Sequence, residues 1–317
     1  MGQIDVIIPT YKPDKRLFDL LDLLMHQTVP VGQIILMNTE QQYYDQLIYG
    51  KRLPDYYKEI KVIHLSHKEF DHGGTRNKGV GFSTNPYFLM MTQDAMPADE
   101  FLLERLQNAL MQDEKIAVAY ARQLPAADAG EVEKLTRAFN YPETPVVKTL
   151  SDLPELGIKT FFCSNVCAMY KREIFDELGG FVKHTIFNED MIYASGAIRA
   201  GYSIAYAAQA EVIHSHNYTN KQQYKRNFDL AVSQADHPEV FDGISSGSEG
   251  IRMVKTCARL LWKNKMANQI PHLVMQSGFK YLGYQKGKNY RKLSYKRIMK
   301  CTSNPNYWKQ KSDYKTR

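Results

Sequence analysis

The amino-acid sequence predicts an α/β protein with a mostly parallel central sheet and helices on both of its faces. Short apolar or β-branched runs recur along the first half of the chain, and each one ends in a polar turn. The segments between successive runs are long enough for helical crossovers, which parallel neighbours require. The 317 residues are 44% hydrophobic, enough to build one large domain with an appendage or two modest domains.

The first strands and helices are expected in alternation. Residues 3–8 form a strand that ends in the loop Pro9 to Pro13, and Leu17, Leu20, Leu21 and Leu24 then recur at helical spacing. Pro13 suits the first position of that helix. Further strands are expected at residues 34–37, 62–65, 87–91 and 116–120, and a helix at 102–110.

The second half of the chain changes character. Residues 122–159 are rich in Ala, Pro and charge, which favours a mobile binding loop. A strand at 166–170, helices at 171–178 and 189–200, and short strands at 203–207 and 211–214 follow. Beyond residue 220 the β pattern ends. We therefore expect a core domain over residues 1–220 and a largely helical extension over 221–317.

The extension is strongly basic, because residues 251–317 contain 17 Lys and Arg but one acid, Asp313. The rest of the chain holds 24 bases and 33 acids. In residues 251–266 the bases fall on one side of a helical wheel and apolar residues on the other. Two readings stay open and are compatible: the apolar side packs on the core domain, or the helix lies on an anionic membrane surface.

Composition also limits the compartment and the type of site. No window approaches 18 consecutive apolar residues, and residues 1–9 lack the pattern of a signal peptide, so we expect a cytoplasmic protein, peripheral on the inner face of the cell membrane. The four cysteines match neither a disulfide framework nor a zinc site, and we interpret them as buried thiols.

Two carboxylate positions suggest chemistry. Asp94 follows the buried run 87–91, and ligands collect at the carboxyl ends of strands in open α/β sheets, so a divalent cation could bind there. The alternative is that Asp94 caps a turn before Pro97. Glu189 and Asp190 open a predicted helix, where the helix dipole favours an ionised carboxylate. The alternative is ordinary helix-terminal charge.

Several motifs occur together in a defined order along the chain. They are Val6-Ile7-Ile8-Pro9-Thr10-Tyr11, Phe70-Asp71-His72-Gly73-Gly74-Thr75-Arg76-Asn77-Lys78-Gly79, Thr92-Gln93-Asp94-Ala95-Met96-Pro97, Asn188-Glu189-Asp190 and Val212-Ile213-His214-Ser215-His216-Asn217-Tyr218. In these motifs and their order the chain resembles family 2 glycosyltransferases, and within that family it resembles bacterial rhamnosyltransferases that use dTDP-rhamnose for cell-surface polysaccharides. The resemblance implies the GT-A nucleotide-diphospho-sugar transferase fold.

The resemblance also implies roles for individual residues. Asp190 is expected to be the catalytic base, and Glu189 to bind an acceptor hydroxyl or orient that base. Asp94 is expected to hold Mg²⁺ or Mn²⁺ together with His214 or, alternatively, His216. The family's metal motif has two acids, whereas this chain has Gln93 in place of one. The remaining expected contacts to the nucleotide sugar come from Pro9, Thr10, Tyr11, Asn38, Glu40, Gly74, Arg76, Asn77, Gln93 and Asp94, and contacts on the acceptor side from Ser164 and Asn165.

The function implied by the resemblance is an inverting transfer of L-rhamnose from dTDP-β-L-rhamnose to a polyprenyl-diphosphate-linked oligosaccharide. A UDP-hexose donor is the alternative within the same reaction class. Two alternatives come from other classes. A sugar-1-phosphate nucleotidyltransferase would place its Gly-rich stretch directly after the first strand, where Pro9-Thr10-Tyr11 stands. A nucleic-acid binder using the basic extension would leave Asp94, Asp190 and His214 unexplained.

Overall fold

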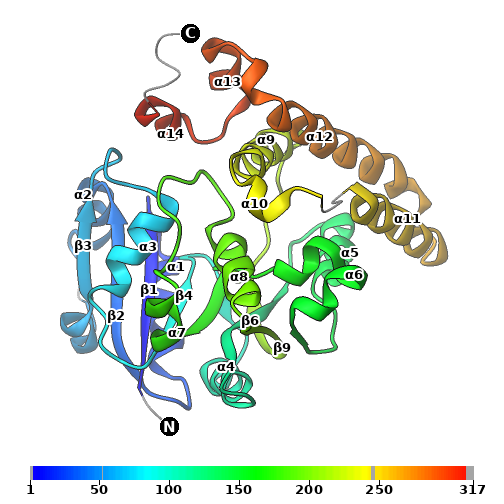
Figure 1. Ribbon diagram of the computed structural model, residues 1–317. Helices are drawn as coiled ribbons and strands as arrows, with labels where there is room; N and C mark the ends of the chain where they lie inside the picture. Colours follow the sequence, from blue (N-terminus) through cyan, green and yellow to red (C-terminus); the bar gives the residue numbers. More distant parts are fainter. Residues whose placement is uncertain (1–2, 52, 244–246, 312–317) are drawn as a thin grey trace.

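The computed structural model describes residues 3–51, 53–243 and 247–311. Within these ranges the strands form one nine-stranded sheet in the order β3-β2-β1-β4-β8-β6-β9-β5, and β7 pairs with β9 (Figure 1). The strands are β1 (Ile4–Tyr11), β2 (Val31–Thr39), β3 (Lys61–Leu65), β4 (Tyr87–Met91), β5 (Met96–Pro97), β6 (Ile116–Leu124), β7 (Val146–Lys148), β8 (Cys167–Lys171) and β9 (Ser203–Ile213).

The sheet has a parallel part and a part in which the direction alternates. β3, β2, β1 and β4 run parallel, β8 pairs antiparallel with both β4 and β6, and β6 runs parallel to β9. The carboxyl ends of β1, β4, β6 and β9 therefore meet at one edge of the sheet. The predicted fold class, an α/β protein with a central sheet flanked by helices, is confirmed.

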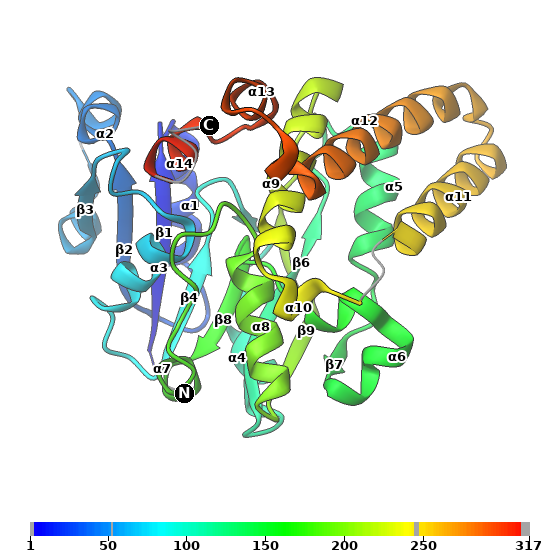
Figure 2. The ribbon, with the colours of Figure 1, turned by 45° about the horizontal axis from the view of Figure 1, so that its top comes forward.

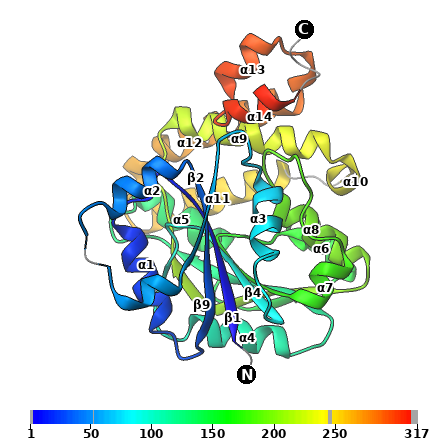
Figure 3. The ribbon, with the colours of Figure 1, turned by 90° about the vertical axis from the view of Figure 1, so that its left-hand side faces the viewer.

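Helices cover both faces of the sheet. On one face α1 (Arg16–Met25) and α4 (Leu102–Met111) bury leucines against strand residues such as Ile8 and Leu89. On the other face α3 (His72–Val80), α7 (Arg172–Glu177) and α8 (Glu189–Arg199) contribute to a second core with Ile7 and Phe88. Figure 3 shows α1 and α3 on opposite sides of β1. α2 (Gln41–Ile48) follows β2.

Three sequence predictions are wrong in detail. Residues 122–159 are not an irregular loop, because they contain the end of β6, α5 (Glu131–Asn140), β7 and the short α6 (Leu153–Leu156). The two strands expected at 203–214 are one strand, β9, whose pairing with β6 shifts between Ala121 and Arg122. α1 begins at Arg16 rather than at Pro13. The four cysteines are free and buried, as predicted.

The part of the chain after β9 consists of helices. They are α9 (Asn220–Asp236), α10 (Pro238–Phe241), α11 (Gly247–Lys263), α12 (Ile270–Lys288), α13 (Tyr295–Cys301) and α14 (Pro305–Gln310). α11 packs on α5 through Cys257, Leu261 and Val132, and α14 returns to the vicinity of β1 (Figure 2). None of the described helices combines the length and the apolar character that crossing a bilayer requires. The division at residue 220 stays a prediction, and Asp313 lies outside the described residues.

Candidate functional site

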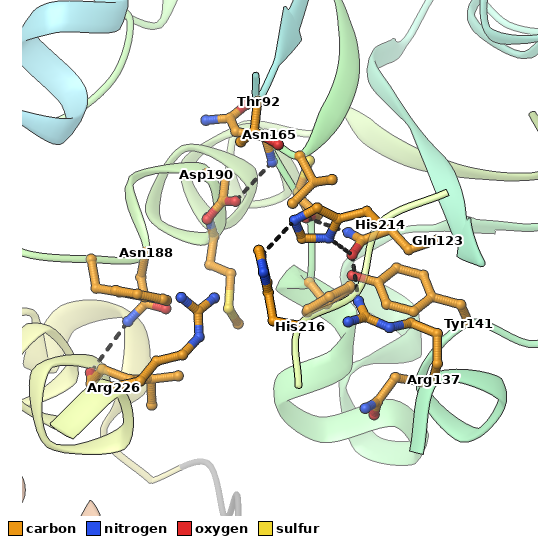
Figure 4. Close-up of a pocket in the computed structure, with 18 of the residues that line it drawn as sticks. Thr92, Gln123, Arg137, Tyr141, Asn165, Asn188, Asp190, His214, His216 and Arg226 are labelled. Carbon is orange, nitrogen blue, oxygen red and sulfur yellow. Dashed lines mark hydrogen bonds between the residues drawn. The ribbon is translucent and has the colours of Figure 1, made fainter. Parts of the chain in front are cut away.

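A cavity of about 490 Å³ opens at the carboxyl ends of the strands (Figure 4). α8 contributes Glu189 and Asp190 to its wall, and the segment after β9 contributes His214 and His216. Polar side chains from β6, α5 and α9 also line it: Gln123, Glu133, Arg137, Gln223 and Arg226.

Asp94 lies beside this cavity because of strand pairing. The turn that holds it follows β4. Met96 and Pro97, which form β5, pair antiparallel with Ile213 and Val212 of β9. This pairing brings the turn next to the residues that follow β9. Asp94 Oδ1 lies 3.6 Å from His214 Nε2, and Asp94 Oδ2 lies 3.3 Å from His216 Nε2. The sequence left open which histidine accompanies Asp94, and the structure brings both to it.

Gln123 fixes the protonation of His214. The Gln123 side-chain oxygen Oε1 accepts a hydrogen bond from Arg137 Nη1 at 2.6 Å, and Arg137 can only donate. The same oxygen lies 3.0 Å from His214 Nδ1, so Nδ1 must carry the hydrogen. His214 is then neutral with a bare Nε2, and burial lowers its pKa to about 3, which keeps it neutral. An imidazole held in this way is the form that binds metal ions.

The three side chains fit a divalent cation. One ligand atom from each of Asp94, His214 and His216 lies within 4.8 Å of the others. Adjacent ligand atoms at about 2.1 Å from an octahedral ion lie about 3 Å apart. The observed separations are close to that value, since His214 Nε2 and His216 Nε2 are 3.1 Å apart. Two imidazole nitrogens and one carboxylate suit Mn²⁺ or another first-row metal better than Mg²⁺, which prefers oxygen ligands.

Gln93, the residue in place of the family's other acid, is engaged with the backbone of Tyr11. Gln93 Oε1 accepts from the Tyr11 N–H, and Gln93 Nε2 donates to the Tyr11 carbonyl, each at 3.0 Å. The side chain therefore joins the ends of β1 and β4. This places Tyr11 directly beside the turn that carries Asp94.

Glu189 and Asp190 sit in different electrostatic surroundings although they are adjacent. Arg76 Nη1 lies 3.3 Å from Glu189 Oε1, with the two side chains 9% and 6% exposed. Burial, the largest single influence, would raise the pKa of Glu189, but the charge of Arg76, the neighbouring His72 and the hydrogen bond from Asn165 together outweigh it, and the pKa is lowered. Burial and the Glu189 charge raise the pKa of Asp190 to about 7. The helix dipole alone predicts the opposite direction for Asp190.

Asn165 positions both acids. Its backbone N–H donates to Asp190 Oδ2 at 3.0 Å, and its side-chain Nδ2 donates to Glu189 Oε1 at 3.2 Å. Tyr170 in turn donates to Asn165 Oδ1 at 2.7 Å. Ser164 lines the same cavity, and its Oγ accepts from Gln123 Nε2 at 2.9 Å. The two residues expected on the acceptor side thus lie between the acids and the His214 cluster.

The residues expected near the nucleoside fall into two groups, those exposed at a second cavity and those buried in the protein. Tyr11 is 40% exposed and lines a second cavity. Thr10 and Asn38 are buried beneath it, where Thr10 Oγ1 donates to Asn38 Oδ1 at 3.1 Å and Asn38 Nδ2 donates to the Glu40 carbonyl at 3.3 Å. Glu40 Oε1 accepts from the His67 N–H at 2.7 Å. Pro9, which precedes them in β1, is not among the residues that line either cavity.

The glycine-rich segment serves the packing of α3. A Cβ on Gly73 would meet the Val182 carbonyl oxygen at 1.8 Å, and one on Gly74 would meet Asp71 Oδ1 at 2.9 Å. Asp71 caps α3 by accepting from the Gly74 N–H. Asn77 exchanges two hydrogen bonds with the backbone of Phe181. The close approaches of the two glycines are thus to the protein's own loops rather than to an open ligand site. His72 and Arg76 of the same motif line the cavity that holds Asp190.

The sequence reading missed several polar residues of the cavity: Gln123, Arg137, Tyr141, Arg226 and Lys280. Gln123 could have been predicted from the sequence, because a polar residue at the end of an apolar strand is the same pattern that identified Asp94. Arg137 and Tyr141 lie in the region taken for a loop. Arg226 and Lys280 come from α9 and α12, and a regular helical pattern does not indicate which face meets a cavity.

Three comparisons relate the chain to known proteins. The family model described as Glycosyl transferase family 2 matches residues 5–179. The O-antigen chain rhamnosyltransferase RfbN of Salmonella typhimurium is 36% identical over 310 residues, covering 96% of each chain. The O-antigen chain rhamnosyltransferase WbaN of Salmonella anatum is 36% identical over 313 residues, covering 97% of this chain and 96% of its own.

The fold is similar to that of a solved structure. It is the mannosyltransferase PcManGT from Pyrobaculum calidifontis in complex with GDP-Man and Mn²⁺, with a TM-score of 0.61 over 92% of this chain and 88% of that chain. The two sequences are 13% identical, so this likeness concerns the fold alone.

Proposed function

Because this chain belongs to glycosyl transferase family 2, we propose that it is an inverting rhamnosyltransferase that uses dTDP-β-L-rhamnose. The proposed acceptor is a polyprenyl-diphosphate-linked oligosaccharide of a surface polysaccharide. Membership of the family makes the chain a glycosyltransferase with the GT-A fold. The sugar is supported by the two Salmonella relatives, both O-antigen chain rhamnosyltransferases that align over nearly their whole length.

One observation carries the assignment of roles: Asp190 and the two histidines beside Asp94 face the same cavity. A glycosyl transfer needs a base for the acceptor hydroxyl and positive charge for the leaving diphosphate. Asp190 supplies the base. Its pKa of about 7 matches the requirement that a general base be partly ionised and still accept a proton at neutral pH.

The proposed reaction is a single displacement. The acceptor oxygen bonds to C1 of rhamnose as the bond between C1 and the diphosphate oxygen breaks. The hydroxyl proton passes to Asp190, and the electron pair leaves with the diphosphate. Asn165 holds one oxygen of Asp190, which leaves the carboxylate aimed from a fixed position. A divalent cation held by Asp94, His214 and His216 would neutralise charge on the diphosphate.

The extension supports a proposed location on the inner membrane surface. On α11 the side chain of Trp262 is 73% exposed and that of Ile251 is 60% exposed, while the exposed bases Lys255, Arg259 and Lys263 lie on the same helix. An amphipathic basic helix with an exposed tryptophan suits an anionic bilayer surface. Leu261 of the same helix is fully buried, so part of its apolar side packs on the core domain.

The test is a donor screen with a matched acid variant. Nucleotide release is followed with dTDP-rhamnose, UDP-glucose, UDP-galactose and UDP-GlcNAc, in Mn²⁺ and in Mg²⁺. We expect preference for dTDP-rhamnose, loss of about 10²-fold or more of the rate in Asp190→Asn, and no change in Asp45→Asn, an exposed acid of α2. A preference for a UDP donor would replace the rhamnose assignment. Full activity of Asp190→Asn would remove the proposed base.

A further inference from the structure

A second cavity of about 410 Å³ lies between the N-terminal part of the sheet and the C-terminal end of the described chain. One wall comes from the ends of β1 and β2 and the loop after β3, through Tyr11, Thr39 and His67. The facing wall is residues 303–310, which we call the C-terminal strap. The strap contributes Ser303, Asn304, Pro305, Asn306, Tyr307 and Gln310. Figure 2 shows α14 of this strap close to β1.

The strap is anchored independently of the cavity. At its start, Asp229 of α9 accepts hydrogen bonds from Thr302 Oγ1 at 2.6 Å and from the Ser303 N–H at 2.8 Å. In α14 the Trp308 side chain is fully buried, with its ring centroid 5.4 Å from that of Tyr290. These contacts fix the strap to the helical extension, so its position over the sheet does not depend on the polar contacts described next.

Two hydrogen bonds link the strap to the loop after β3. Gln310 Nε2 donates to the Lys68 carbonyl at 2.8 Å. Asn306 Nδ2 lies 3.2 Å from His67 Nδ1 and donates to it, so the hydrogen of that ring is on Nε2. His67 Nε2 then donates to the Tyr11 hydroxyl at 3.0 Å. A relay runs from Asn306 through His67 to Tyr11, and it holds the phenol ring in one orientation.

The interior of this cavity suits a planar heterocycle with polar edges. The Tyr11 ring is held edge-on by Tyr43 and His67, with centroids 5.6 and 4.8 Å away, and is itself 40% exposed. Thr39 is 2% exposed, and its Oγ1 has no hydrogen-bond partner within the described residues. An aromatic face beside an unsatisfied buried hydroxyl offers both stacking and a polar contact to a nucleobase.

Tyr11 links the second cavity to the turn that carries Asp94. Tyr11 lines the cavity with its ring, and its backbone is held by Gln93, the residue before Asp94. A molecule with its base at Tyr11 therefore has its diphosphate end directed toward Asp94. Accepting the proposed function, we propose that the C-terminal strap forms the outer wall of the site for the donor's nucleobase. Asn306 is a positioning residue that acts on the base through His67 and Tyr11.

The experiment measures nucleotide binding without an acceptor. dTDP, UDP, GDP and inorganic pyrophosphate are titrated calorimetrically into the full chain in Mn²⁺, for wild type and Asn306→Ala. Loss of the relay should weaken dTDP binding about fivefold, the effect of one lost hydrogen bond, and leave pyrophosphate binding unchanged. In turnover, the donor KM should rise with kcat unchanged. Gln310→Ala should act in the same direction, and Lys309→Ala, an exposed residue of the same helix, should have no effect.

The outcomes separate this inference from the proposed function. If wild type binds a nucleoside diphosphate and Asn306→Ala binds it equally well, the strap is not part of the base site and the proposed function stands. An equal loss of dTDP and pyrophosphate affinity would mean a general structural defect and would also overturn the role of the strap. If wild type binds none of the nucleoside diphosphates, both proposals fail.

Discussion

Replacing Glu189 by Gln tests the electrostatic coupling of the two adjacent acids. A base must be ionised to accept a proton, so the kcat/KM of wild type should rise with pH through the Asp190 pKa of about 7. Burial is the larger cause of that raised pKa and the Glu189 charge the next. Glu189→Gln removes the like charge and leaves Arg76 unneutralised. Both changes favour the ionised form of Asp190 and lower its pKa.

The size of the effect follows from the neighbouring charge. A like charge on an adjacent buried residue shifts a pKa by about one unit or more. The acid limb of the pH profile should therefore move to lower pH by about one unit. At pH 6 the ionised fraction of Asp190 would rise from about one tenth to about one half, a change of about fivefold relative to the plateau.

The assay is the pH profile of kcat/KM for the donor, between pH 5.5 and 9. The position of the limb is compared rather than the plateau, because the loss of the Arg76 ion pair can lower the plateau by itself. Glu155→Gln, an exposed glutamate of α6, should keep the wild-type profile. A limb that stays in place in Glu189→Gln would show that the Glu189 charge does not set the Asp190 pKa, and the reasoning would be wrong.

Two further predictions concern the cation and the membrane. Gln123→Ala removes the acceptor that fixes the His214 tautomer, so Mn²⁺ affinity, measured as free Mn²⁺ by electron paramagnetic resonance, should fall about 10-fold or more. An unchanged affinity would mean that His214 does not bind the ion. Trp262→Ala should weaken sedimentation with anionic vesicles and leave nucleotide binding intact, whereas Tyr49→Ala, 87% exposed on the core domain, should change neither. Equal sedimentation of Trp262→Ala and wild type would remove α11 as the contact.

The sequence predicted the fold class and most of the strands because the patterns that indicate strands and helices are local. Each run such as residues 87–91 is apolar over the length of a buried strand and ends in a polar turn, and that pattern survives in β4 with Asp94 at its end. The helix that begins at Glu189 was predictable for the same reason, because its pattern depends on residues that are neighbours in the sequence. The prediction of a loop over residues 122–159 was wrong because the prolines and alanines around α5 obscure its helical periodicity. The amphipathic side of α5 packs on α11, which lies far along the chain.

By itself the sequence determined which side chains end the strands, which acids open α8 and that the extension is basic and helical. Only the tertiary structure decided that His216 joins His214 at Asp94, because this depends on the pairing of β5 with β9. It also decided that Arg76 faces Glu189 and that Asn306 returns to His67. Contacts between residues far apart in sequence depend on how whole helices and strands pack, and local periodicity does not indicate that packing.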